Sequence, residues 1–150
     1  MSEISPISLR AATPDDAVAI ADLAVQLGYP VSSAEMMARL SKLPAETECV
    51  MVGSVDGDVK AWMQIGIAMS IESEPFVEIR GLVVEEKLRA SGLGSRLVDY
   101  AKVWAQTKGV SSLRVRSNTA RTATHAFYER RGFIVSKSQK VFAFTLPQSA

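Results

Sequence analysis

The stretch from Phe76 to Leu97, FVEIRGLVVEEKLRASGLGSRL, decides how this chain folds. Its first part, Phe76 to Val84, is an apolar run of the kind that forms a strand. A charged segment then leads to a turn that holds Gly92 and Gly94, and from Leu93 onward the apolar spacing is helical. A helix that begins inside a tight turn presents free backbone N–H groups and the positive end of its dipole to an anion. The stretch therefore predicts a site for a phosphorylated molecule.

The composition is that of one ordinary globular domain. The chain has 150 residues, of which 47% are hydrophobic and 22% charged, so we expect a single domain over residues 1–150. The only cysteine, Cys49, excludes an internal disulfide, and a single histidine makes a zinc site implausible. No segment resembles a secretory signal or a membrane span, which predicts a cytoplasmic protein that does not contact a membrane.

The charges are unevenly divided between the two halves of the chain. Residues 1–75 hold 4 Lys+Arg and 11 Asp+Glu, whereas residues 76–150 hold 13 and 5. One reading is chance segregation on solvated faces. The other is a basic half that holds an anionic cofactor and an acidic half that receives a cationic partner.

The other segments carry clear boundary signals. Thr13-Pro14 reads as a helix start, Ser32-Ser-Ala-Glu35 as a capping box, and Asp56-Gly57 as a hairpin turn. The order is β α α β β β α β α β β, which predicts an α/β (α+β) fold: a mixed sheet with helices on both faces. The predicted strands are Ile7–Ala11, Thr47–Val55, Asp58–Met69, Phe76–Val84 after a polar break at Glu72–Pro75, Leu113–Ser117, Phe133–Val135 and Lys140–Leu146. The predicted helices start at Thr13, Ser32, Leu93 and Arg121.

Two common phosphate-binding motifs do not fit the glycine turn. A dinucleotide fingerprint needs a third glycine where Leu97 stands, and the Walker loop needs a Gly-Lys-Ser/Thr run that is absent. Instead, Leu82-Val-Val followed by Arg89-x-x-Gly92-x-Gly94 resembles motif A of the GCN5-related N-acetyltransferase (GNAT) superfamily. The run His125-Ala-Phe-Tyr128-Glu-Arg-Arg-Gly132-Phe is similar to that superfamily's motif B. Ala90 and Glu86 depart from the pattern, since many members have glycine and proline there.

The resemblance implies a GNAT-like fold, mostly antiparallel and twisted, in which splayed strands form a slot for acetyl-coenzyme A. The pyrophosphate would bind at the turn, and the pantetheine arm would pair with the strand like a further strand. Gly81, in a strand rich in large residues, fits a bulge or a close backbone approach, although simple packing explains it as well. The cofactor-binding residues implied are Leu82, Val83, Val84, Arg89, Ala90, Ser91, Gly92, Leu93, Gly94, Ser95, Arg96, Asn118 and Tyr128.

Glu78 is the candidate general base. An amine is an ammonium near neutral pH and must lose a proton before it attacks a thioester. Glu78 lies four residues before Leu82, where many superfamily members carry a catalytic glutamate. The alternative is that Glu78 only pairs with Arg80, which lies two residues away on the same strand face.

Tyr128 is the candidate general acid, because its phenol can donate a hydrogen bond to the departing sulfur, as the matching tyrosine does in much of the superfamily. The alternative is an aromatic residue in the core. Adjacent helical residues point about 100° apart, so we assign Phe127 to the core and Tyr128 to the cofactor. Direct transfer needs no enzyme nucleophile, and we expect Cys49 to be buried.

Further polar residues have a structural reading beside the functional one. Asn118 fits either pantetheine binding or turn capping, and Arg121 fits either a phosphate contact or a solvated helix start. Arg114 and Arg116 alternate on one strand face and read equally well as plain surface. Four acidic residues would favour a cationic amine in the acceptor site, with Trp62 or Tyr29 lining it: Glu46, Glu48, Glu72 and Glu74.

The function expected is direct transfer of an acetyl group from acetyl-CoA to a primary amine of a small molecule or peptide, without a covalent enzyme intermediate. The alternative is a non-catalytic acyl-CoA-binding regulatory domain on the same fold. Nucleic acid is not expected as a partner, because the arginines lie on several elements without an interleaved aromatic platform. The sequence leaves open whether the chain forms a homodimer and which amine it takes.

Overall fold

The computed structural model describes residues 6–117 and 120–148. The chain divides into two compact units, Met1–Arg116 and Ser117–Ala150. The expectation of one domain over residues 1–150 stays a prediction.

The first unit carries the sheet and three of the α-helices. Its elements are β1 (Ile7–Ala11), η1 (Pro14–Asp16), α1 (Ala17–Gln26), α2 (Ser33–Ser41), β2 (Glu48–Val55), β3 (Asp58–Ser70), β4 (Ser73–Val84), η2 (Glu86–Leu88), α3 (Leu93–Thr107) and β5 (Leu113–Val115). The polar break expected at Glu72–Pro75 is wrong, because Ser73 already pairs with Ser70 and the strand begins there. The hairpin between the two strands is therefore tighter than the sequence indicates.

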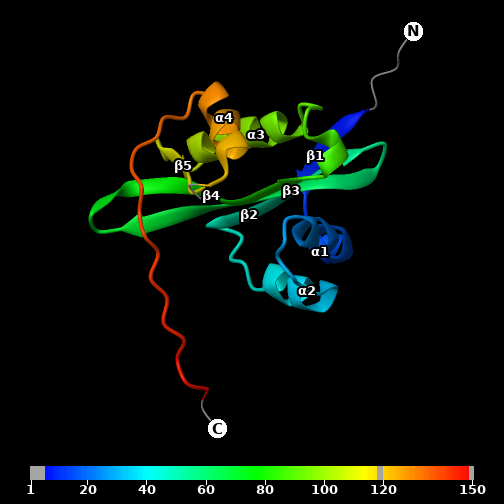
Figure 1. Cartoon of the computed structure of the whole chain (residues 1–150), viewed down its shortest axis with the longest axis horizontal. Helices are drawn as coiled ribbons and strands as arrows, with labels where there is room; N and C mark the ends of the chain where they lie inside the picture. The colour runs from blue at the N-terminus through cyan, green and yellow to red at the C-terminus, as the bar shows by residue number, and fades with distance from the viewer. Residues whose placement is uncertain (1–5, 118–119, 149–150) are drawn as a thin grey trace. The chain divides into compact units, whose positions relative to one another are not determined.

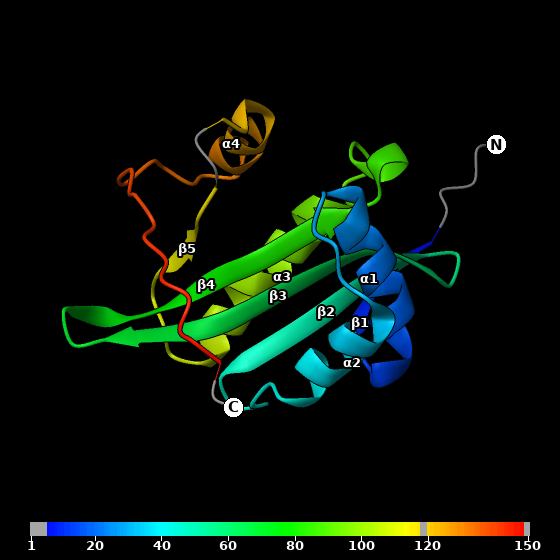
Figure 2. The ribbon, with the colours of Figure 1, turned by 60° about the horizontal axis from the view of Figure 1, so that its bottom comes forward.

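The strands form one sheet in the order β1-β2-β3-β4-β5. The first three pairings are antiparallel and the last, between β4 and β5, is parallel. This confirms the mixed, mostly antiparallel sheet. Figures 1 and 2 show α3 on one face of the sheet and α1 with α2 on the other.

A close contact shows which side chains lie beneath α3. A Cβ added to Gly53 of β2 would lie 2.6 Å from Cδ1 of Leu93, so α3 packs against the backbone here. Gly53 is paired with Ala61 of β3, and side chains alternate between the two faces along a strand. The α3 face therefore also carries Met63 and Ile65, which are fully buried.

Several local predictions are confirmed. Ser32 and Glu35 form a reciprocal capping box at the start of α2, with N···O distances of 3.0 Å. The hairpin turn has Asp56 at φ 53° and Gly57 at φ 85°, the left-handed pair that a two-residue loop requires. The helix expected from Thr13 starts as the short 3₁₀ turn η1 and continues as α1.

Where the structure describes it, the second unit contains one helix, α4 (Thr122–Arg130). The strands expected at Phe133–Val135 and Lys140–Leu146 are wrong, since the described residues after Gly132 form no strand. Their apolar side chains, such as Phe142 and Phe144, are 90% and 85% exposed. Strand propensity reflects packing against neighbouring strands, and no strand among the described residues pairs with this segment.

Within the described residues, no helix combines the length and apolar character needed to cross a membrane.

Candidate functional site

The glycine turn forms as the sequence predicts. Gly92 adopts φ 89° and ψ −1° as the N-cap of α3, a left-handed conformation that favours glycine. The Ser91 hydroxyl donates to the Leu88 carbonyl at 2.6 Å and accepts from the Leu93 N–H at 3.3 Å. The N–H groups of Gly94 and Ser95 find no acceptor among the described residues. These two donors are therefore available to an anion at the helix start.

The departures from motif A cost the turn little. Ala90 is not among the described residues with positive φ, so this position does not require glycine. Arg89 is exposed, and its guanidinium can reach toward an anion from the solvent side. Arg96 donates through Nη1 to the Ile7 carbonyl at 3.1 Å, which ties the start of α3 to β1.

Strand β4 is paired unequally on its two edges. On one edge it pairs with β3 as far as Val84, but on the other it meets β5 only at Val77–Ile79. Beyond Ile79, the edge that includes Leu82, Val83 and Val84 has no partner strand among the described residues. This open edge leads directly toward the glycine turn, and an extended chain can pair with it.

A bulge in β4 lies where the open edge begins. Ile65 is paired with Ile79 and Gln64 with Gly81, so Arg80 is the extra residue. A Cβ on Gly81 would lie 2.8 Å from the indole ring of Trp62. The bulge expected at Gly81 is therefore present, and the Trp62 ring packed against Gly81 is the simple packing that was the alternative explanation. The Trp62 indole nitrogen is buried and has no hydrogen-bond partner within the described parts of the chain.

Glu78 lies on the sheet face opposite α3, because its partner in β3 is Gly66, one residue on from Ile65. Its carboxylate is nearly buried, with the side chain 10% exposed. Arg80 donates to it through Nη1 at 2.9 Å, and Arg116 donates through Nη2 at 3.3 Å while its Nε lies 3.1 Å from Oε2 as an ion pair. The ion pair with Arg80, weighed as an alternative role, is thus present, and Arg116 is a second partner.

Glu48 completes this charge network. Arg80 binds it through two parallel contacts, Nε to Oε1 at 2.9 Å and Nη2 to Oε2 at 3.0 Å, and Gln64 donates to Oε1 at 3.1 Å. A Cβ on Gly66 would overlap the Glu48 carboxylate. Gly66 therefore provides the space in which this carboxylate fixes Arg80 beside Glu78. The sequence predicts that the negative charge of Glu48 attracts a cationic acceptor, but in the structure this charge is paired with Arg80.

Arg114 in β5 and Arg116 just after it both make specific contacts, so they are not simply solvent-exposed surface residues. Arg114 is register partner to Glu78 and lies with its guanidinium 3.9 Å from the centre of the Phe76 ring, a cation–π contact. Arg116 pairs with Glu78 as described. Of the other expected residues, Tyr29 is 61% exposed, Arg121 is exposed at the start of α4, and Asn118 lies outside the described residues.

Tyr128 belongs to the second unit and is its buried aromatic residue, 8% exposed. Its ring packs edge-on against Phe127 and Phe133, with centroids 5.0 and 5.3 Å apart. Phe127 is only half-buried, so Tyr128 is the more buried of the two rings, whereas the cofactor role expected of Tyr128 stays a prediction. Burial raises the pKa of Tyr128 to about 12, opposed by the nearby charge of Arg131. The phenol is therefore a hydrogen-bond donor at neutral pH.

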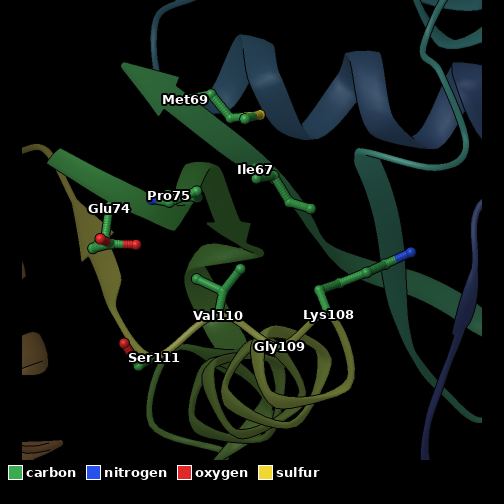
Figure 3. Close-up of a pocket in the computed structure, with 8 residues that line it drawn as sticks. All are labelled: Ile67, Met69, Glu74, Pro75, Lys108, Gly109, Val110 and Ser111. Carbon is green, nitrogen blue, oxygen red and sulfur yellow. The ribbon is translucent and has the colours of Figure 1, made fainter. Parts of the chain in front are cut away.

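A shallow pocket of about 280 Å³ lies at the far end of α3 from the glycine turn (Figure 3). Its walls come from the ends of β3 and β4 and from the α3–β5 connection: Ile67, Met69, Glu74, Pro75, Lys108, Gly109, Val110 and Ser111. A helix as long as α3 spans about 22 Å, so this pocket and the turn are separate. Ile67 follows Gly66 in the strand and points to the opposite face from Glu78. The pocket therefore does not open onto the carboxylate.

Cys49 is half-buried rather than fully buried. Burial raises the pKa of its thiol, against smaller opposing effects of Tyr100 and Lys108. The described residues include no cluster of three or more His, Cys, Asp or Glu that could hold a metal ion.

The contact between Gly66 and Glu48 gives a stability test. Gly66→Ala should destabilise the protein by about 1–3 kcal/mol, because the new methyl group overlaps the Glu48 carboxylate. In a Glu48→Ala background the same change should be neutral or stabilise by roughly 0.5–1 kcal/mol, because alanine is favoured over glycine in a strand. Denaturant unfolding of the four proteins measures the coupling. Equal costs in both backgrounds would contradict the assigned contact.

The sequence was compared with models of known protein families and with curated proteins. The family model described as "Acetyltransferase (GNAT) family" matches residues 17–133. No curated protein matches the chain.

Solved structures share the fold. An aminoglycoside 6'-N-acetyltransferase from Acinetobacter baumannii has a TM-score of 0.81 at 14% identity, covering 95% of this chain and all of that one. Glucosamine-6-phosphate N-acetyltransferase from Arabidopsis thaliana has a TM-score of 0.77 at 17% identity, covering 93% and 99%. An aminoglycoside N-acetyltransferase in complex with CoA has a TM-score of 0.80 at 17% identity, covering 97% and 98%.

These structures are similar in fold alone, whereas the family model covers more than half of the sequence and includes both the glycine turn and the bulged strand. The chain belongs to the acetyltransferase (GNAT) family.

Proposed function

We propose that this protein transfers an acetyl group from acetyl-CoA directly to the primary amine of a small molecule or peptide. Family membership supports acetyl transfer. One observation carries the rest: a single strand, β4, holds a nearly buried carboxylate at Glu78 and, a few residues later, an open edge that leads into the glycine turn. A base, a binding edge and an anion site thus follow one another along the chain.

The residues of the turn fit the phosphate groups of coenzyme A. A side chain added at Gly92 would meet nothing within 4 Å, so space is open beside the unpaired N–H groups of Gly94 and Ser95. Arg89 adds a positive charge at the exposed side. Of the backbone N–H groups expected from Leu93 to Arg96, those of Leu93 and Arg96 already donate to the Ser91 hydroxyl and the Gly92 carbonyl, so Gly94 and Ser95 would supply the main-chain donors. The structural neighbour in complex with CoA supports the same cofactor here. When bound, acetyl-CoA supplies a thioester-activated acetyl group.

The open edge of β4 would hold the extended pantetheine arm. Leu82, Val83 and Val84 offer backbone groups there that no described strand uses, and unpaired strand edges accept extended chains through main-chain hydrogen bonds. The parallel pairing with β5 stops at Ile79. The place where the two strands part would therefore hold the reacting end of the cofactor, close to Glu78.

Glu78 would remove the proton from the acceptor's ammonium, directly or through an ordered water. Its side chain is nearly buried, and Arg80 fixes its orientation through a guanidinium that is itself fixed by Glu48. A base held this firmly is positioned for proton transfer before the acceptor arrives. The acceptor would approach on the face opposite α3, where Trp62 also lies.

Tyr128 would donate a proton to the departing sulfur. With a pKa of about 12, its phenol keeps its proton at any pH at which the enzyme works. Cys49 does not act as a nucleophile in this scheme, because burial raises the pKa of its thiol and so disfavours the reactive thiolate. A direct transfer needs no such nucleophile.

The function is tested by incubating the protein with acetyl-CoA and a panel of amines. Release of free thiol should depend on the amine, and the amine should gain an acetyl group by mass spectrometry. The panel spans simple amines, aminoglycosides, amino acids and peptides. A protein that binds acetyl-CoA but acetylates no member of the panel would favour the regulatory alternative.

The glycine turn is tested by cofactor-dependent stabilisation. Acetyl-CoA at 100 times its Kd should raise the free energy of unfolding by about 2.7 kcal/mol, seen as a higher Tm. Gly92→Glu should abolish this shift by placing a negative charge at the phosphate site. Gly28→Glu is the matched control, because Gly28 has the same φ of 89° and the same open surroundings. A shift retained in Gly92→Glu would remove the turn from the cofactor site.

Glu78→Gln tests the base. The amide keeps the shape but accepts no proton, so kcat should fall by about 10²-fold or more, while the acetyl-CoA-induced Tm shift remains. Asp99→Asn, which alters an exposed carboxylate on α3 to which no role is assigned, should retain wild-type kcat. If Glu78→Gln kept full turnover, Glu78 would be an ion-pair partner only.

Tyr128→Phe tests the acid. Transfer should slow by about 10²-fold while the fold, checked by circular dichroism, is retained. Because the pKa of Tyr128 is about 12, the phenol stays protonated across the assay range. The slowing should therefore be the same from about pH 6 to pH 10. A Tyr128→Phe protein with wild-type activity would return Tyr128 to a packing role.

A further inference from the structure

The Glu78 carboxylate is bound by two arginines that differ in how firmly they are held. Arg80 is 32% exposed and makes three charged contacts, two with the Glu48 carboxylate and one with Glu78. Arg116 is 71% exposed and makes its described contacts with Glu78 alone. Arg80 is thus a built-in partner, whereas Arg116 reaches the carboxylate from solvent.

Arg116 is the partner that can leave. It follows the last residue of β5, Val115, and an exposed ion pair contributes little to stability because solvent screens it. Arg80 cannot leave at similar cost, because it stands in the β4 bulge and is bound to Glu48 through two parallel contacts. A bound ligand can therefore replace an arginine at Glu78 only on the solvent side of the carboxylate, where Arg116 lies.

The solvent side of Glu78 is also where an acceptor must place its ammonium to give up a proton. A guanidinium and an ammonium carry the same charge and donate hydrogen bonds to the same carboxylate oxygens. Arg116 therefore occupies the position that the acceptor needs. An acceptor can bind there only by displacing it.

The charges around Glu78 indicate what kind of acceptor does this best. On this part of the sheet face, three arginines, Arg80, Arg114 and Arg116, stand against two glutamates, Glu48 and Glu78. A plain ammonium would add a second uncompensated positive charge a few ångströms from the displaced Arg116. An acceptor that also carries an acidic group leaves the net charge around Glu78 unchanged. Its acidic group can also form an ion pair with the displaced Arg116.

We propose that the acceptor is an amine that carries a carboxylate or phosphate close to its amino group, and that Arg116 moves from Glu78 to that acidic group when the acceptor binds. This deepens the proposed acetyl transfer and rests on it. Arg114, held over the Phe76 ring beside Glu78, presents a second guanidinium to the same acidic group. Arg116 is then a specificity-determining residue, which blocks plain amines and recruits acidic ones.

The test uses two matched pairs of acceptors: tyramine with tyrosine, and ethanolamine with phosphoethanolamine. Wild-type protein should acetylate at least one acidic member with a higher kcat/KM than its plain partner. The pair in which this preference appears shows whether the site recognises a carboxylate or a phosphate. Acceptor binding is measured in parallel by calorimetry without acetyl-CoA. A wild-type preference for the plain member of both pairs would overturn the inference.

Arg116→Ala should have opposite effects on the two members. For the acidic acceptor, kcat/KM should fall by about tenfold or more, the effect of losing a hydrogen-bonded charge partner. For the plain acceptor, KM should fall, because its competitor for Glu78 is gone. Equal effects on both members would show that Arg116 is only a structural partner of Glu78.

Two further variants keep the test decisive. Arg116→Lys retains the charge and should preserve the preference for the acidic member. Arg39→Ala, on α2, removes a similarly exposed arginine with one carboxylate partner, Glu35, and should leave both kcat/KM values unchanged. Folding of each variant is checked by its acetyl-CoA-induced Tm shift. If wild-type protein acetylates no amine at all, the proposed acetyl transfer fails, and the inference fails with it. If it does acetylate but Arg116→Ala changes both members alike, only the inference fails.

Discussion

Strand β4 is paired with β3 along most of its length, up to Val84, but with β5 over only three residues. Every part of the candidate site depends on this inequality. The paired edge fixes the backbone, and the bulge within it sets Arg80 on the same side as Glu78. The unpaired edge supplies free backbone groups, and the strand then leads through η2 to the turn at Gly92. One strand thus provides the scaffold, the unpaired edge proposed to bind the cofactor, and the carboxylate.

The carboxylate illustrates how a charge is kept in a nearly buried position. Burial of an unpaired carboxylate is costly, and it is tolerated when hydrogen-bonded cations compensate the charge. Here Arg80 bridges two glutamates, and Gly66 leaves room for one of them. The sheet backbone, rather than a helix or loop, positions each of these groups, which favours a well-defined geometry.

Local signals in the sequence predicted the parts of the fold that depend on a few neighbouring residues. Ser32 with Glu35, Asp56-Gly57 and Gly92 each specify a cap or a turn, and each formed where expected. The strands expected after Gly132 failed because a strand needs a partner, which propensity does not provide. The roles of Glu48 and Arg116 were missed for a similar reason: Glu48 meets Arg80 across 32 residues of sequence, and Arg116 meets Glu78 across 38. One signal could have predicted the role of Arg116: Arg114 and Arg116 alternate on one face of a strand that pairs in parallel with the strand of Glu78.

The state of the only cysteine bears on how the protein can be studied. Thiol-detecting reagents react with thiolates, and burial keeps the Cys49 thiol protonated and half-covered. A colorimetric reagent added to the folded protein should therefore react slowly with the chain itself. The coenzyme A thiol released by turnover would then be counted over a low background, without replacing the cysteine.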